Sequence, residues 1–151
     1  RAALQVMPQL ESQYIDTGRV LLVWRHYPLP IHSSARRAAE AAECAGRQAK
    51  FWELHDWAFA HQQGLQADRL RDTAERLGLD IPAFDKCTGG EAVERISSDI
   101  ALAEQLDVSA TPTWFIGPVE PNGTVRPVDR ITGLGPVDVY RKSLDRIGQS
   151  R

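Results

Sequence analysis

The sequence is poor in cysteine. Its 151 residues include only Cys44 and Cys87, and no CxxC is present. The two cysteines are far apart and have no Cys/His spacing around them, and the four histidines form no metal-binding spacing either. A zinc site or other metal site is therefore not expected. From the residues alone, either the two cysteines pair with each other or both are buried thiols.

Long apolar runs and excess charge are also missing. No apolar stretch approaches the roughly 20 residues that a membrane-spanning helix needs, so we expect no membrane-spanning segment. The net charge of −2 gives no reason to expect a nucleic-acid partner or an anionic membrane. No Ser/His/Asp nucleophile elbow, phosphate loop or dinucleotide fingerprint occurs, and no cofactor is predicted. The length suits one globular domain with a real core.

The spacing of apolar residues predicts a helix, a strand, a block of helices, two hairpin strands and a last helix. Pro8 is expected to kink the first helix, and Ser33 or Ser34 can cap the second. Helices are predicted at 1–17, 35–45, 51–62, 66–77, 80–87, 93–106 and 137–147, and strands at 20–27, 113–116 and 125–131.

The most informative motif is Thr111-Pro112, which leads directly into the apolar strand 113–116. Proline has no N–H, so it is tolerated at the first residue of a strand but not inside a central one. An X-Pro bond is the only common site of a cis peptide, although trans is the commoner state and is favoured here from the residues alone. Such a step would leave a rigid, exposed Thr111 backbone that can pair with an extended peptide.

The element order and several short motifs resemble the DsbA-type family of thiol–disulfide oxidoreductases over nearly the whole chain. The residues that carry the resemblance are Val20 to Leu29 with Ile31-His32 and the Ala-rich stretch after it, Lys50 to His55, Leu77-Gly78-Leu79, Phe84 to Cys87, and Val108 to Thr113. The resemblance implies an α/β protein with a thioredoxin-like fold and an inserted all-helical domain. The thioredoxin-like parts would be 1–31 and 107–151, and the insert 32–106.

The resemblance also implies roles for particular residues. Thr111-Pro112 would form a cis-proline loop that faces the redox disulfide, with the Thr111 backbone holding an extended or unfolded polypeptide substrate. Members of the family carry an extra bond in the helical domain, so a structural Cys44–Cys87 disulfide is favoured over two reduced thiols or a second redox pair. Such a bond would indicate an extracytoplasmic location, in the bacterial periplasm or exported. A redox partner protein is also implied.

One departure from the family pattern limits the functional prediction. The family's nucleophile is the first cysteine of a CxxC at the start of the first helix, where free N–H groups stabilise the thiolate. Here that helix has already begun at Arg1. We therefore expect the CxxC and the first strand of the fold to precede Arg1, and the chain alone to be inactive. A strand donated by a neighbouring molecule is the alternative for the fold.

Two other functions remain open at this stage. One is a non-redox module that keeps the peptide-binding loop but has no redox cysteines. The other is a cytosolic relative with glutathione-linked or isomerase chemistry. The residues encoded before Arg1 discriminate among the three: a CxxC, neither cysteine, or a lone Ser or Cys.

Overall fold

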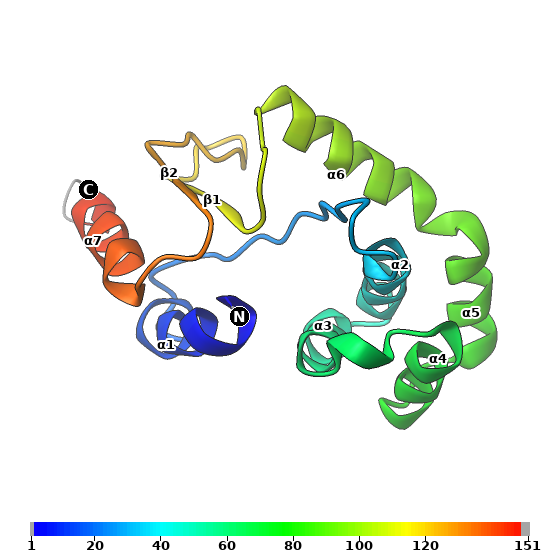
Figure 1. Cartoon of the computed structure of the whole chain (residues 1–151). Coiled ribbons are helices and arrows are strands. Elements are labelled where there is room, and N and C mark those ends of the chain that lie inside the picture. The colour runs from blue at the N-terminus through cyan, green and yellow to red at the C-terminus, as the bar shows by residue number, and fades with distance from the viewer. Residues whose placement is uncertain (1, 149–151) are drawn as a thin grey trace. The chain divides into compact units, whose positions relative to one another are not determined.

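The structure is a computed structural model that describes residues 2–148. The chain divides into two compact units, one formed by the residues up to Val23 together with those from Val108 onward, the other by Trp24–Asp107. The first unit carries the sheet, and the second is entirely helical (Figure 1). This division matches the predicted arrangement, in which an all-helical insertion interrupts a sheet-bearing unit. Among residues 2–148, no helix is long and apolar enough to cross a membrane.

The first unit combines helical turns with a two-stranded antiparallel sheet. Its elements are η1 (Ala2–Val6), α1 (Met7–Leu10), η2 (Glu11–Ile15), β1 (Thr113–Ile116), β2 (Asp129–Thr132) and α7 (Val137–Gly148). The predicted first helix is therefore present but irregular, because π-helical turns flank the short α1 that contains Pro8. Proline supplies no N–H for the regular pattern, which accounts for a departure at this position.

The core of this unit lies between the N-terminal helical turns and α7. Val6, Leu10, Tyr14 and Tyr140 are buried together, and Val20 and Trp114 pack against them. The Tyr14 hydroxyl donates a 2.9 Å hydrogen bond to Asp145 on α7. The apolar spacing that predicted the first helix thus marks the face that it buries.

The strand predicted at 20–27 does not form. The segment is not assigned to any element, although exposure alternates along it and the side chains of Leu21 and Val23 are 73% and 52% exposed. Between Leu21 and Tyr27, the only backbone hydrogen bond to another described residue is from the His26 N–H to Asp99. A strand needs a partner to complete its ladder, and the described residues supply none here.

The second hairpin strand is also shorter than predicted. β2 starts at Asp129 rather than residue 125, and Val125 makes only an isolated bridge with Val119. The register pairs Trp114 with Ile131 and Ile116 with Asp129. Beyond Ile116 the hairpin is held by separate bonds, such as Arg126 N–H to the Pro118 carbonyl at 3.0 Å, rather than by a continuous ladder.

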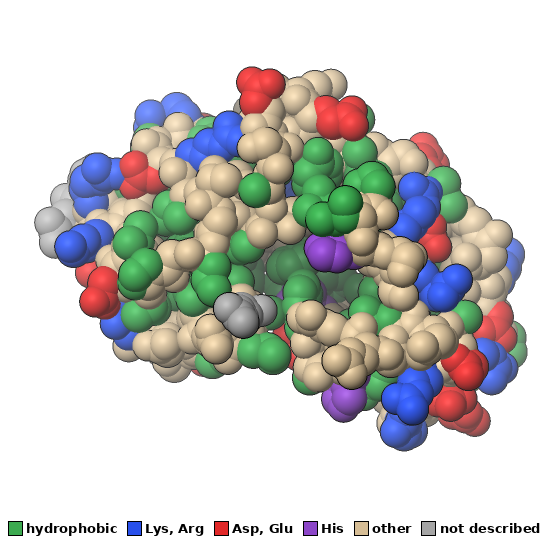
Figure 2. All heavy atoms as spheres, viewed as in Figure 1, with side chains coloured by type: hydrophobic (Ala, Val, Ile, Leu, Met, Phe, Trp, Pro, Cys, Tyr) green, Lys and Arg blue, Asp and Glu red, His purple; other side chains and the backbone are tan. Residues whose placement is uncertain are grey.

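The second unit is a bundle of helices. These are α2 (Ala35–Gly46), α3 (Phe51–Ala60), η3 (Gln62–Gly64), α4 (Ala67–Arg76), α5 (Ile81–Lys86), η4 (Cys87–Glu91) and α6 (Val93–Gln105). Each predicted helix is found with ends shifted by a few residues. Ser34 occupies the position before α2, but its side chain makes no capping bond. The core contains Ala41, Cys44, Leu54, Leu70, Phe84 and Cys87. Acidic and basic side chains intermingle over the outside of these helices in Figure 2.

The helical unit begins earlier than the insert predicted at 32–106, because residues 24–26 pack on its helices. The Trp24 ring lies 4.3 Å from that of His55 and 5.9 Å from that of Phe59, measured between ring centroids. Arg25 and His26 both bind Asp99 on α6. These contacts join residues 24–26 to the helical unit.

Candidate functional site

Thr111 and Pro112 lie in the short loop that leads into β1, and two hydrogen bonds hold this loop. The peptide bond between them is cis. Behind it, the Thr113 hydroxyl donates to the Ala110 carbonyl at 2.7 Å, and the Gly133 N–H donates to the Pro112 carbonyl at 2.8 Å. The second bond ties the loop to the end of β2. The loop is therefore braced from within the sheet-bearing unit.

Thr111 itself keeps its hydrogen-bonding groups free. Its side chain is exposed, and in the described part of the chain neither its backbone groups nor its hydroxyl has a hydrogen-bond partner. A braced loop that presents an unpaired N–H and C=O can add an extended peptide as a further strand. Thr111 thus has backbone groups without a partner among the described residues, and their pairing with a peptide stays a prediction.

β1 pairs with β2 along one of its edges. The Gly133 N–H donates to the Pro112 carbonyl and the Val128 N–H donates to the Ile116 carbonyl, so Pro112 and Ile116 face β2. Because a strand residue directs its N–H and C=O to the same side and successive residues alternate, Thr113 and Phe115 direct theirs to the opposite edge. Within the described residues β1 is paired only with β2, and the first strand expected before Arg1 lies outside them.

Cys44 and Cys87 form a disulfide, with Cα atoms 5.7 Å apart. It joins α2 to the start of η4, and both residues are buried in the helical core, at 1% and 4% exposure. Neither sulfur is a free thiol, and no other cysteine is present in the sequence. The sequence therefore holds no free thiol, and this bond cross-links α2 to η4 within the helical unit.

Sequence reasoning missed a polar cluster around Asp99. The Asp99 carboxylate is buried and accepts hydrogen bonds from the His26 N–H at 3.0 Å and from Arg25 at 3.4 Å. Arg95 lies 3.6 Å from the same carboxylate, and the His26 ring lies 3.6 Å from Glu43 on α2. The available signal was the position of Asp99, three residues after Ile96 on the predicted apolar face of α6.

Two histidines of the helical unit are buried, and burial is the main reason that their pKa values fall below the ordinary 6.5. Asp99 and Glu43 partly oppose the shift in the pKa of His26, and Asp56 opposes that in the pKa of His55. The His55 Nδ1 lies 2.8 Å from Asp56, whereas its buried Nε2 has no partner within the described residues. The His55 ring packs among the aromatic rings of Trp24, Phe51 and Phe59. Across residues 2–148, no group of three or more His, Cys, Asp or Glu side chains could hold a metal ion.

These features define a class of protein: a thioredoxin-fold protein with an inserted helical unit, a braced proline loop and a structural disulfide. Comparison with known sequences agrees. The sequence model of the family described as thioredoxin matches residues 1–127, and the chain belongs to this family.

Solved structures show the same fold. The crystal structure of Wolbachia pipientis alpha-DsbA1 superposes with a TM-score of 0.83 at 22% identity, covering 99% of this chain and 78% of that one. The structure of a variant of that protein superposes with the same TM-score of 0.83, at 21% identity. This likeness extends across both units and supports the DsbA-type architecture that the sequence resemblance implied.

The similar curated proteins are named as antiporters and not as thioredoxin-fold proteins. The chain is 41% identical over 114 residues to Na(+)/H(+) antiporter NhaA 3 of Salinispora tropica and to NhaA 1 of Salinispora arenicola. It is 37% identical over 108 residues to NhaA 1 of Mycolicibacterium vanbaalenii. In each case the matched part is only 18% of the antiporter's length, although it covers 69% to 74% of this chain.

Proposed function

We propose that the protein exchanges disulfides with extended polypeptide substrates, using a CxxC that precedes Arg1. The observation that carries the proposal is the braced Thr111-Pro112 loop, whose exposed Thr111 has no hydrogen-bond partner within the described residues. The DsbA-type fold supports it, because that architecture places such a loop in a thiol–disulfide oxidoreductase of the resembling family.

In the proposed reaction, the thiolate of the first cysteine attacks a sulfur of a substrate disulfide. One S–S bond forms as another breaks, and the departing substrate thiolate takes up a proton. The second cysteine then attacks the mixed disulfide, which releases the reduced substrate and leaves the CxxC oxidised. The reverse sequence oxidises a substrate dithiol, so a single exchange needs no further oxidant.

This chain's residues would hold the substrate during exchange. The Thr111 N–H and C=O pair with the backbone of an extended segment, which keeps the substrate sulfur in place for in-line attack. Pro112 offers no N–H that could compete for the thiolate. The Thr111 hydroxyl is available to donate a hydrogen bond to a nearby sulfur. An extracytoplasmic location belongs to the same proposal, supported by the Cys44–Cys87 disulfide.

The test compares the protein that includes the residues encoded before Arg1 with this chain alone, in insulin reduction and dithiol-peptide oxidation. We expect activity only in the longer protein, with loss on changing the first cysteine of its CxxC to Ser. Thr111→Pro in the longer protein removes the N–H and should weaken trapping of a cysteine-containing peptide. Absence of a CxxC, or turnover by this chain with only Cys44 and Cys87, would overturn the proposal.

The antiporter relatives favour a second candidate: a thioredoxin-fold domain carried by a larger transport protein. Identity of 41% over 114 residues supports it, because the match covers 74% of this chain yet 18% of the antiporter. The complete gene and membrane fractionation of its product test the idea. Recovery of a protein of only this domain's size in the soluble fraction would contradict it. The two candidates are compatible if the longer protein also carries a CxxC.

A further inference from the structure

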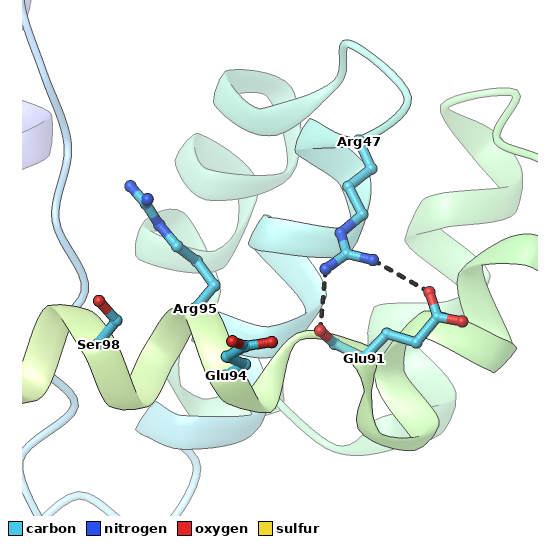
Figure 3. A pocket seen from close by; sticks show the side chains of 5 residues that line it. All are labelled: Arg47, Glu91, Glu94, Arg95 and Ser98. Atoms are coloured by element: carbon cyan, nitrogen blue, oxygen red, sulfur yellow. Dashed lines mark hydrogen bonds and ion pairs between the residues drawn. The ribbon is translucent and has the colours of Figure 1, made fainter.

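The helical unit has two surface depressions whose charges are arranged differently. The first, of about 280 Å³, is lined by Arg47, Glu91, Glu94, Arg95 and Ser98 (Figure 3). Arg47 donates to the Glu91 carboxylate at 3.0 Å and to the Glu91 carbonyl at 2.9 Å, as the dashed lines show. Arg95 is paired with Asp99. The cations of this first depression already have protein acceptors, so it has little capacity for an anionic ligand.

The second depression is larger, about 610 Å³, within the range of small-molecule sites. It lies where α3 passes through η3 toward α4, and its lining comprises Phe59, Ala60, His61, the η3 turn Gln62–Gly64 and Arg69. The side chain of Arg69 is the one Lys or Arg in this lining, and the lining contains no carboxylate. The Phe59 ring forms its apolar wall. Asp68 is adjacent to Arg69, but one of its carboxylate oxygens accepts the Arg69 backbone N–H at 2.9 Å.

Arg69 is the arginine of α4 whose guanidinium has no acceptor. Arg71 binds both carboxylate oxygens of Asp85 at 3.1 Å, and Arg76 donates to the Asp72 carbonyl at 3.2 Å. The Arg69 guanidinium makes no hydrogen bond or ion pair with any residue from 2 to 148. Five N–H donors in a planar fork are therefore available at the depression.

Gly64 leaves room for the Arg69 guanidinium to lie against the η3 turn. A Cβ added at Gly64 would lie 2.9 Å from an Arg69 Nη atom and 3.4 Å from its Cδ, so the Arg69 side chain rests on the bare backbone of this turn. Glycine permits the approach because it has no side chain to occupy the space. The guanidinium is thereby held against the wall of the depression.

Other polar side chains lie beside the fork. The His61 Nδ1 lies 2.8 Å from the Trp57 carbonyl, and the ring stacks on Trp57 with centroids 4.6 Å apart. Because a carbonyl only accepts, Nδ1 carries the proton of this hydrogen bond, which fixes the ring at the edge of the depression. The exposed carboxamides of Gln62 and Gln63 add donors that no described residue uses.

We propose that this depression binds a small organic carboxylate, with Arg69 as the anchoring residue. A guanidinium fork matches the planar carboxylate through two parallel N–H···O bonds, which is the strongest neutral-pH pairing that this donor set offers. The carboxamides of Gln62 and Gln63 can donate to the same oxygens, and the Phe59 ring suits the apolar part of the ligand. This inference goes beyond disulfide exchange and does not depend on it.

The test is an NMR titration of the ¹⁵N-labelled chain with sodium acetate, against sodium chloride at matched ionic strength. We expect a saturable shift of the Arg69 Nε–H signal and of the Gln62 and Gln63 amides with acetate alone. Arg69→Gln should weaken binding by about tenfold or more, the value of a charge-assisted pair. Arg71→Gln, the matched control on the same helix, should bind acetate unchanged.

Three results would overturn the proposal. The first is a shift that stays linear with acetate or is reproduced by chloride. The second is equal weakening by Arg69→Gln and Arg71→Gln, which would indicate a general charge effect. The third is saturable binding of inorganic phosphate with no binding of acetate, which would assign the site to a different anion. Because the Arg69 guanidinium has no protein partner, we expect Arg69→Gln to keep the thermal unfolding midpoint, and this is checked in the same samples.

Discussion

The Asp99 carboxylate accepts the backbone N–H of His26 at 3.0 Å, although the two residues are 73 positions apart in the chain. Asp99 is 2% exposed, and it also pairs with Arg25 and Arg95, whose guanidinium groups reach solvent. One buried carboxylate thus fastens residues 25–26, where the helical unit begins, to α6, the helix that ends this unit.

Asp99→Ala should destabilise the protein by about 3 kcal/mol, because it leaves a buried N–H and two arginines without their acceptor. Asp99→Asn should cost less, since the amide oxygen can still accept the His26 N–H. Urea unfolding followed by circular dichroism measures both. Equal losses for the two variants would show that the negative charge, and not the hydrogen bond, carries the effect.

Reduction of the Cys44–Cys87 bond should destabilise the helical unit. The bond closes a loop with a sequence separation of 43 residues, for which the chain-entropy model gives about 4 kcal/mol. We expect the double variant Cys44→Ser/Cys87→Ser to unfold at a lower urea concentration than the oxidised parent. The reduced parent should unfold at the same urea concentration as the double variant. Labelling with a thiol reagent in denaturant without reductant should modify neither cysteine of the parent. Two labelled cysteines would contradict the disulfide.

Stability should fall as the pH drops below about 6.5. Burial lowers the folded-state pKa values of His26 and His55 beneath the ordinary 6.5. Between the unfolded and folded pKa values the unfolded chain therefore binds more protons, so acid favours unfolding. The full stability is present above pH 6.5, and the loss levels off below the folded-state pKa values. Urea midpoints between pH 8 and pH 5 test this window.

A matched pair of variants tests how much His55 contributes to the dependence of stability on pH. His55→Phe keeps an aromatic ring in the cluster and removes the unpartnered Nε2, so we expect a shallower dependence of stability on pH. His32→Gln removes an exposed histidine and serves as the control for the loss of one histidine from the chain. An unaltered slope in His55→Phe would mean that His55 does not contribute to the acid sensitivity.

Gly117→Ala should disrupt the hairpin beyond β1. A Cβ at this position would clash with the Arg126 carbonyl oxygen, which belongs to the backbone and cannot move away as a side chain could. We expect a loss of about 1–3 kcal/mol or more, as for other overpacked sites. Gly89→Ala is the control, because nothing lies within 4 Å of its added Cβ. Equal thermal midpoints for the two variants would contradict the close approach.

The local pattern of residues was enough to predict much of the fold. Periodic apolar residues located the α-helices of the helical unit, because each of these helices buries the face that its own sequence marks, whereas the turn η4 at Gly89-Gly90 was not predicted. The motif Thr111-Pro112 located the start of β1 for an equally local reason, since proline supplies no N–H to a ladder. The π-helical turns beside Pro8 were less predictable, because they depend on how α1 packs as well as on the missing N–H.

Strand pairing and polar contacts could not be predicted from the local sequence. The alternation at residues 20–27 predicted a strand, yet a strand forms only where a second backbone completes the ladder, and no described residue does so there. Asp99 lies on the apolar face of its helix, but its local sequence does not show that the fold brings the His26 N–H to it. Arg69, Arg71 and Arg76 likewise look equivalent along α4, and only the placement of Asp85 and Gly64 distinguishes them.

The sequence by itself thus determined where the chain coils, where the proline loop begins, and that only two cysteines are available. The tertiary structure decided that those cysteines are joined and buried, that Asp99 has three partners, and that the Arg69 guanidinium has none among the described residues. The physical reason is the distance along the chain over which each effect acts. Helical periodicity and proline's missing N–H act within a few residues, whereas burial and pairing depend on groups that are distant along the chain and meet only after folding.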